Sequence, residues 1–180
     1  MSICLLLVVI ESLGDEGRVW LRYERALLMD GEWWRLLTGH LTHLGWTHLA
    51  LNVMGLALMW ALFYDDYPLR QWALILVCSL IAIDAGFFFI DRNLRWYVGL
   101  SGVLHGVMAA GTLAHLRRRE PDVWILLPFL VGKLIYEQFV GTMPYSLESA
   151  NGPVVVDAHL YGTLGAVVAV LMLRWRRLPL

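Results

Sequence analysis

Two polar side chains at the start of apolar segments are the residues of this sequence that could do chemistry. Ser101 opens one apolar segment directly after Gly99-Leu100, and His159 opens another near the C-terminal end. A hydroxyl group and an imidazole at membrane depth are costly unless they serve a function. A nucleophile and a neighbouring base are the minimum equipment of nucleophilic catalysis. We therefore take Ser101 as the candidate nucleophile and His159 as the candidate base.

The glycines beside Ser101 favour this interpretation. Gly99 permits a tight entry into the helix, which would leave Ser101 in the first turn among unpaired backbone N–H groups. Those donors, at the positive end of the helix dipole, suit a developing oxyanion. The plainer alternative is that Ser101 and Gly102 are ordinary packing residues, since Ser and Gly are common where membrane helices touch.

Three further polar residues belong to the same candidate site. His48 and Asn52 are four residues apart and so lie on one helix face, where an imidazole and an amide can donate to an oxyanion. The alternative for Asn52 is a hydrogen bond that joins two helices. His105 lies one turn after Ser101, so we expect it beneath the site, packed against His159 or tuning it.

Small residues predict which segments touch. Gly102 and Gly106 form one small-residue face, and Ala158 and Gly162 form a matching face after which Gly165 follows. Faces of this kind let two helix backbones approach closely. We expect the two segments to pack along them and to bring the imidazole within reach of the hydroxyl. The alternative is a histidine satisfied by a backbone carbonyl.

The composition sets the class of protein. The chain has 180 residues, of which 59% are hydrophobic and only 16% are charged. A soluble domain of this length carries roughly 25% charged residues, so the sequence indicates an all-α polytopic membrane protein. A net charge of −1 argues against a nucleic-acid partner. Cys4 and Cys78 lie in apolar segments and indicate buried thiols rather than a disulfide framework.

Apolar segments separated by short polar connections predict a single membrane domain, 1–180, built as a six-helix bundle. The first segment is the shortest, and the other five approach the ~20 residues that cross a bilayer. A polar and aromatic stretch, 14–45, suits the membrane interface. The expected helices are approximately 3–13, 46–64, 71–90, 98–115, 123–140 and 154–173.

Arginines predict the orientation. They cluster at 117–119, between the fourth and fifth segments, and at 174–177 after the sixth, whereas 141–153 contains no Lys or Arg. The positive-inside rule places the two clusters in the cytoplasm. With six helices both termini are then cytoplasmic, and the four candidate site residues on the second, fourth and sixth segments all lie in the outer third of the membrane.

Other polar residues receive structural interpretations. Lys133 and Glu137 are four residues apart and can neutralise each other, either as a structural pair or as part of a substrate-recognition surface. Asp84 has no assignable partner. His40 and His43 match no zinc spacing with His48, so a role in packing the first loop is preferred and no metal site is expected.

Four motifs in this order resemble the rhomboid family of intramembrane serine proteases. They are Trp34-Arg35, His43 with His48 and Asn52, Gly99-Leu100-Ser101-Gly102, and Ala158-His159-Leu160-Tyr161-Gly162. The resemblance implies a six-helix core, Ser101 as nucleophile, His159 as general base and no cofactor. It also implies an oxyanion hole made by His48, Asn52 and the Ser101 backbone N–H, and a Trp-Arg loop in the outer leaflet.

Within that family the sequence looks most like rhombosortase, through its short length, 31–40 and the Lys133-xxx-Glu137-Gln138-xx-Gly141 pattern. Rhombosortases are taken to cleave a C-terminal sorting tail from bacterial secreted proteins; the tail has a Gly-Gly motif, an apolar helix and a basic end. The sequence departs from the family in two places: His105 replaces the usual Tyr, and Gly39 stands where many members have His.

The sequence thus predicts a serine endopeptidase of the bacterial inner membrane whose site opens to the periplasm, and whose partners are the lipid bilayer and transmembrane or tail-bearing proteins. The alternatives are a general rhomboid protease with other transmembrane substrates, an inactive rhomboid-like binding protein, and a small transporter. A transporter would use Asp84, Lys133 and Glu137 as a polar pathway, but signals of discontinuous helices are lacking.

Overall fold

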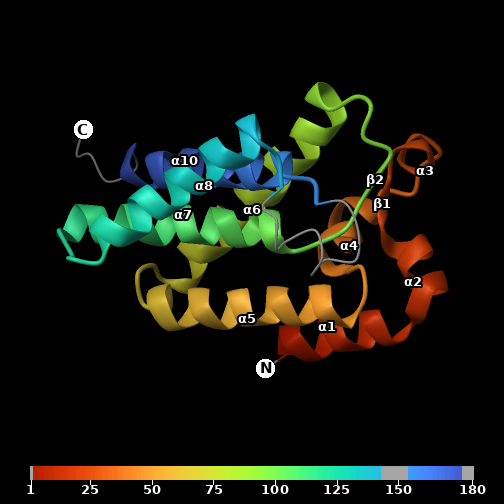
Figure 1. The fold of residues 1–180 in the computed structure, drawn as a ribbon, viewed down its shortest axis with the longest axis horizontal. Coiled ribbons are helices and arrows are strands. Elements are labelled where there is room, and N and C mark those ends of the chain that lie inside the picture. Colours follow the sequence, from red (N-terminus) through yellow and green to blue (C-terminus); the bar gives the residue numbers. More distant parts are fainter. Residues whose placement is uncertain (1, 143–153, 176–180) are drawn as a thin grey trace.

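The computed structural model describes residues 2–142 and 154–175, and in these the chain is mostly helical, with one pair of two-residue strands (Figure 1). This confirms the all-α class. The short N-terminal helices are α1 (Ser2–Ser12), α2 (Gly14–Leu21), α3 (Arg25–Met29) and α4 (Arg35–Leu41). The longer helices are α5 (Trp46–Phe63), α6 (Leu69–Ala85), α7 (Ser101–Arg118), α8 (Val123–Phe139) and α10 (Asp157–Trp175). A π-helical turn, η1 (Gly86–Ile90), continues α6.

The two helices that carry a candidate catalytic residue each begin three residues later than expected. The helix expected over 98–115 begins at Ser101, because Gly99 has φ +130°, which no helix contains. The helix expected over 154–173 begins at Asp157. Ser101 is therefore the first residue of its helix, and His159 the third residue of its own.

The stretch 14–45 is more structured than an interfacial loop. It forms α2, α3, α4 and strand β1 (Tyr23–Glu24), which pairs antiparallel with β2 (Trp96–Tyr97) just before α7. Arg35, only 2% exposed, donates from Nη1 to the carbonyls of Val19 and Arg22 and so fastens this region together. The neighbouring Trp34 is 43% exposed, as suits an interfacial ring.

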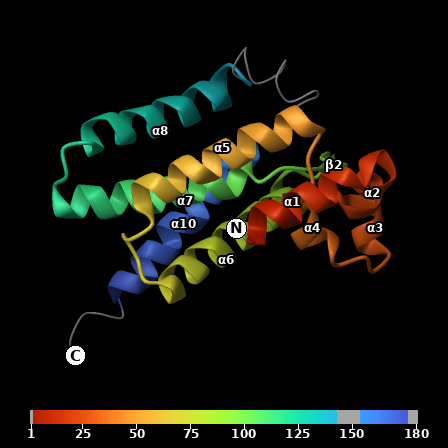
Figure 2. The same ribbon diagram turned by 90° about the horizontal axis from the view of Figure 1, so that it is seen from below.

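Helix α7 is the centre of the bundle. It contacts α5, α6, α8 and α10, and Figure 1 shows it between α5 on one side and α8 and α10 on the other. Figure 2 shows the same helices from below, with the short N-terminal helices gathered beside one end of the bundle. Small residues suit a helix with four neighbours, and many of the buried residues of α7 are small: Gly102, Gly106, Ala109, Ala110, Gly111 and Ala114.

The closest packing is between α7 and α10. A Cβ atom added to Gly102 would lie 2.9 Å from the Ala158 carbonyl oxygen, and one added to Gly106 would lie 2.8 Å from the Gly162 carbonyl oxygen. A Cβ atom added to Gly162 would overlap the Gly102 carbonyl group. The two small-residue faces of the sequence therefore meet, backbone against backbone.

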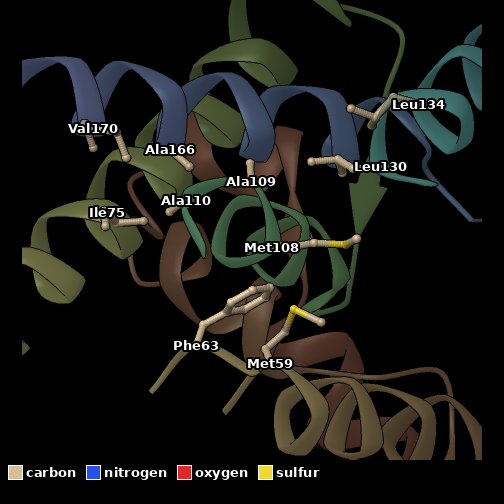
Figure 3. Close-up of a cluster of buried hydrophobic side chains, with 11 residues drawn as sticks. Met59, Phe63, Ile75, Met108, Ala109, Ala110, Leu130, Leu134, Ala166 and Val170 are labelled. Atoms are coloured by element: carbon tan, nitrogen blue, oxygen red, sulfur yellow. The ribbon is translucent and has the colours of Figure 1, made fainter. Parts of the chain in front are cut away.

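Farther along the bundle the same helices enclose an apolar cluster (Figure 3). Met59 and Phe63 of α5 reach toward α7, and Ala166 and Val170 of α10 cover its opposite side. Leu130 of α8 also joins this cluster. Between membrane helices a cluster of this kind is stabilised by van der Waals packing, because lipid tails are as apolar as these side chains.

Two described helical stretches are long and apolar enough to cross a membrane by length and composition alone: Trp46–Phe63 and Leu69–Ile90. The sequence predicted six spans, so for the others crossing stays a prediction. For α7 the physical reason is that its neighbours enclose it. An enclosed helix does not need the apolar side chains that lipid contact requires, and small residues serve its packing better.

We predict that Gly162→Ala lowers the free energy of unfolding by about 1–3 kcal/mol, the usual cost of forcing extra volume into a packed contact. The new methyl group would push α10 away from the Gly102 carbonyl. Thermal unfolding of the detergent-solubilised protein measures this.

The matched control is Gly132→Ala on α8, where an added Cβ meets no heavy atom of the described residues within 4 Å. It should leave stability unchanged or raise it slightly, because alanine is the better helix former. Equal losses in the two variants would contradict the account of the α7–α10 contact.

Candidate active site

Ser101 is held at the start of α7 by the segment that precedes it. The Gly99 N–H donates to the Gly39 carbonyl over 3.0 Å, and the Tyr97 hydroxyl donates to the Gly99 carbonyl over 2.7 Å. The left-handed φ of Gly99 turns the chain into the helix. The hydroxyl of Ser101 is thereby fixed at the N-terminus of α7, where the first N–H groups of the helix lack intrahelical partners.

His159 faces Ser101 from α10. Its Nε2 lies 3.0 Å from the Ser101 Oγ, within hydrogen-bond distance, and its side chain is buried. The backbone contact between α7 and α10 produces this approach, because Ala158 packs directly against Gly102. The structure therefore brings together the hydroxyl and the imidazole that the sequence singled out.

His105 stacks on His159. The two ring centroids are 3.9 Å apart and the planes are 15° from parallel. The His105 Nδ1 lies 2.7 Å from the Ser101 carbonyl oxygen, and since a carbonyl only accepts, Nδ1 carries the proton and donates. His105 thus lies where the sequence placed it, one turn below Ser101 and against the candidate base.

Glu137 makes a contact that the sequence did not indicate. Its Oε2 lies 2.8 Å from the Nδ1 of His159, and its Oε1 accepts from the Lys133 ammonium group. Glu137 is 2% exposed and His159 is 4% exposed. Because a carboxylate accepts, the proton of the neutral imidazole belongs on Nδ1, which leaves the Nε2 lone pair facing the Ser101 hydroxyl.

The spacing of Lys133 and Glu137 concealed this role. A Lys and a Glu four residues apart can neutralise each other, so their spacing indicates no third partner. The one available signal is that a carboxylate has two oxygens, and a single ammonium group occupies only one of them.

His48 and Asn52 lie on the other side of Ser101. The His48 Nδ1 accepts from the Leu44 N–H over 3.2 Å, so the ring proton belongs on Nε2. The Asn52 Nδ2 donates to the His48 carbonyl over 3.0 Å and keeps a second N–H. A Cβ atom on Gly99 would lie 3.2 Å from the His48 Cε1, so the ring is close to the turn before Ser101.

These side chains line a common cavity of about 410 Å³. Its polar wall comes from α5, α7, α8 and α10, and its remaining wall is apolar. The polar lining residues are His48, Asn52, Ser101, His105, Lys133 and His159. A cavity with a few convergent polar groups among apolar side chains is the usual form of a small binding site.

The first-loop histidines occupy structural places near the site. His40 Nε2 lies 3.2 Å from Asp84 Oδ1, which gives Asp84 the partner that the sequence could not assign. His43 packs edge-to-face against His48, with ring centroids 5.2 Å apart. Burial lowers the pKa of His43, in the segment between α4 and α5, to about 3, so this ring is neutral at physiological pH.

His105, Glu137 and His159 are close enough to form a metal-ligand set. Their ligand atoms already have hydrogen-bond partners, however: His105 Nδ1 donates to the Ser101 carbonyl, and both nitrogens of His159 are engaged. These hydrogen bonds explain the arrangement without a metal. That the mechanism uses no metal stays a prediction.

A family model and two known proteins are similar in sequence to this chain. The family model described as "Rhomboid domain" matches residues 30–176. The chain is 26% identical to "Putative rhomboid protease YdcA" of Bacillus subtilis over 138 residues, which cover 76% of this chain and 65% of that protein. It is 32% identical to "Rhomboid protease GluP" of the same organism over 98 residues, 54% of this chain and 19% of that protein. The chain thus spans less than two thirds of either relative.

We predict that Gly99→Ala slows the reaction of Ser101 with a fluorophosphonate by about tenfold, because general base catalysis is sensitive to small displacements. The added methyl group would strain the backbone at φ +130° and press on His48. The labelling rate, measured below the unfolding temperature, is the readout.

Gly31→Ala is the matched control. Gly31 also has a left-handed φ, of +99°, but an added Cβ meets no heavy atom of the described residues within 4 Å. Gly31→Ala should strain the backbone as Gly99→Ala does, but its Ser101 should be labelled at the wild-type rate. A labelling loss of the same size in Gly31→Ala would contradict a local effect at Gly99.

Proposed function

The chain belongs to the rhomboid family, and on this premise we propose that it is a serine endopeptidase that cleaves membrane-protein substrates with Ser101 as nucleophile and His159 as base. The observation that carries the proposal is the 3.0 Å approach of the Ser101 Oγ to the His159 Nε2. A half-buried hydroxyl and a buried imidazole at this distance, beside a cavity, have the geometry of an activated nucleophile.

Acylation begins when the Ser101 Oγ attacks the carbonyl carbon of the scissile peptide. The hydroxyl proton passes to the His159 Nε2, and the carbonyl oxygen becomes an oxyanion. When the tetrahedral intermediate collapses, the C–N bond breaks and the Nε2 proton passes to the leaving amine. The products of this half-reaction are an acyl-enzyme on Ser101 and a free amine.

Deacylation repeats these steps with water. A water molecule loses a proton to the His159 Nε2 as its oxygen attacks the ester carbonyl. The C–Oγ bond then breaks and the proton returns to Ser101, which leaves a free carboxylic acid and regenerates the enzyme. Water must reach the cavity for this step, which favours a site near the membrane surface.

The oxyanion has three donors close to it in this proposal. They are the Ser101 backbone N–H at the start of α7, the His48 Nε2–H, and the second N–H of the Asn52 amide. Donors that are already oriented stabilise a developing charge more than water does, because they need no reorganisation. The dipole of α7 adds to this effect.

The proposed location is the bacterial inner membrane, with both termini in the cytoplasm and the site open to the periplasm. The arginines at 117–119 and Arg174 support this orientation. Arg176 and Arg177, which belong to the same argument, lie outside the described residues. The protein acts within the bilayer, so lipid and its substrates are its proposed partners.

For the substrate we propose the C-terminal sorting tail of secreted proteins, with its Gly-Gly motif, apolar helix and basic end. The similarity of 31–40 and 133–141 to rhombosortase supports this choice. A transporter pathway has lost its support, since Asp84 pairs with His40 and Lys133 pairs with Glu137.

Ser101→Ala and His159→Ala should each reduce cleavage of a transmembrane substrate by at least about 1,000-fold while the protein stays folded. The measurement is cleavage in proteoliposomes, with thermal unfolding of each variant beside it. An inactive binding protein would instead hold the substrate uncut in the wild type as well. Cleavage retained by purified Ser101→Ala would contradict the proposed nucleophile.

A reporter that ends in a Gly-Gly, apolar-helix and basic tail should be cut at or beside the Gly-Gly motif, since the tail would place this motif at the membrane surface. Removing the basic end or replacing both glycines by valine should abolish cleavage. Mass spectrometry of the products identifies the bond. Equal cleavage of a transmembrane substrate without this tail would favour a general rhomboid protease.

A further inference from the structure

We infer that Glu137 is a positioning residue, which holds His159 in the tautomer and orientation that accept the Ser101 proton. The catalytic unit is then a Ser–His–Glu series rather than the two-residue dyad that the resemblance implies. This inference rests on the proposed function, because it assigns a role within that same site. It is carried by the contact between Glu137 Oε2 and His159 Nδ1.

The three groups form a continuous chain of hydrogen bonds. Glu137 Oε2 is 2.8 Å from one imidazole nitrogen, and the Ser101 Oγ is 3.0 Å from the other. The carboxylate is reached from α8 and the imidazole from α10, so the contact joins two helices. Both side chains are almost fully buried, where water competes little for the hydrogen bond.

The carboxylate settles which nitrogen carries the proton. An imidazole with its proton on Nε2 would point a donor at Ser101 and remove no proton from it. Glu137 accepts from Nδ1–H and so favours the other tautomer, in which Nε2 is the base. As His159 gains its second proton, the same carboxylate stabilises the imidazolium.

His105 fixes a different degree of freedom. A ring stacked at 3.9 Å and 15° limits the tilt of the His159 ring but still permits a half-turn about the Cβ–Cγ bond, which exchanges the ring nitrogens with ring carbons. A hydrogen bond at Nδ1 favours the one orientation in which Nε2 faces Ser101. The stack and the carboxylate therefore complement each other, and neither makes the other redundant.

Lys133 orients the carboxylate and also supplies the competing explanation. Its ammonium group donates to Glu137 Oε1, which turns Oε2 toward His159. If Glu137 served only to neutralise Lys133, its contact with His159 would have no effect on the reaction. Removing both charges together separates the two explanations.

The test compares Lys133→Met/Glu137→Gln with Lys133→Met/Glu137→Met in the full-length protein. Neither double variant buries an unpaired charge. The amide oxygen of Gln still accepts from His159 Nδ1, whereas the thioether of Met is a poor acceptor. Lys133→Met alone is the reference, because it keeps the carboxylate.

The readouts are the rate of fluorophosphonate labelling of Ser101 and the kcat and KM of substrate cleavage, below the unfolding temperature of each variant. We expect Lys133→Met/Glu137→Met to label and to turn over at least about 100-fold more slowly than Lys133→Met, as loss of general base catalysis does. Lys133→Met/Glu137→Gln should label and turn over about tenfold faster than Lys133→Met/Glu137→Met, and its KM should be unchanged.

Glu137→Gln alone should be slower than the Gln double variant. The Lys133 ammonium group would attract the amide oxygen, so the NH₂ group would face His159 Nδ1 and favour the unproductive tautomer. A merely structural residue would not produce this order of rates among folded variants.

Equal rates in Lys133→Met and both double variants would overturn the role of Glu137 and leave the proposed function intact, provided that Ser101→Ala abolishes labelling. Labelling that persists in Ser101→Ala would instead overturn the proposed function itself. If the Met double variant does not fold, the comparison of Lys133→Met with Lys133→Met/Glu137→Gln decides the inference by the same criterion.

Discussion

The site depends on one packing constraint, the backbone contact between α7 and α10. Gly102 and Gly162 leave no room for a side chain between these helices, and the contact is made one residue after Ser101 and three after His159. The Ser101 hydroxyl and the His159 imidazole, 58 residues apart, are thereby held within hydrogen-bond distance. Larger residues at these positions would separate the helices and lengthen that distance.

Around this contact, separate elements each fix one feature of the site. The turn at Gly99, held by Tyr97 and the Gly39 carbonyl, sets the height of the Ser101 hydroxyl. The N-terminal region, which is held together by the hydrogen bonds of Arg35, contains Gly39 and so supports that turn. On α8, the Glu137 carboxylate faces the His159 ring. The candidate chemistry is preorganised by four or more segments, none of which is sufficient alone.

Local patterns in the sequence predicted a large part of this arrangement. The spacing of small residues indicated which helices touch, and the position of His105 one turn after Ser101 indicated its stack on His159. These features follow from helical periodicity, which the sequence carries directly. The contacts of Asp84 with His40 and of Glu137 with His159 could not be predicted in this way. Each joins separate elements, and their approach depends on packing that no local spacing encodes.

The resemblance to rhomboids does not indicate Glu137 either, because it implies a pair of catalytic residues without an acid. The hydrophobic runs are apparent in the sequence, but only two of the described helices are long and apolar enough to cross a membrane by length and composition alone, and α7 is covered by its neighbours. A helix buried among other helices and a helix that faces lipid differ in amino-acid composition. Hydropathy identifies only the helix that faces lipid.

The most direct measurement of the central claim is the identity of the residue that a fluorophosphonate modifies in the folded protein in lipid bilayers. The account predicts a single phosphonylated peptide that carries the label on Ser101, because the Ser101 hydroxyl lies 3.0 Å from the Nε2 of His159, its proposed base. A label on another serine or threonine, or a folded protein that takes no label, would contradict it.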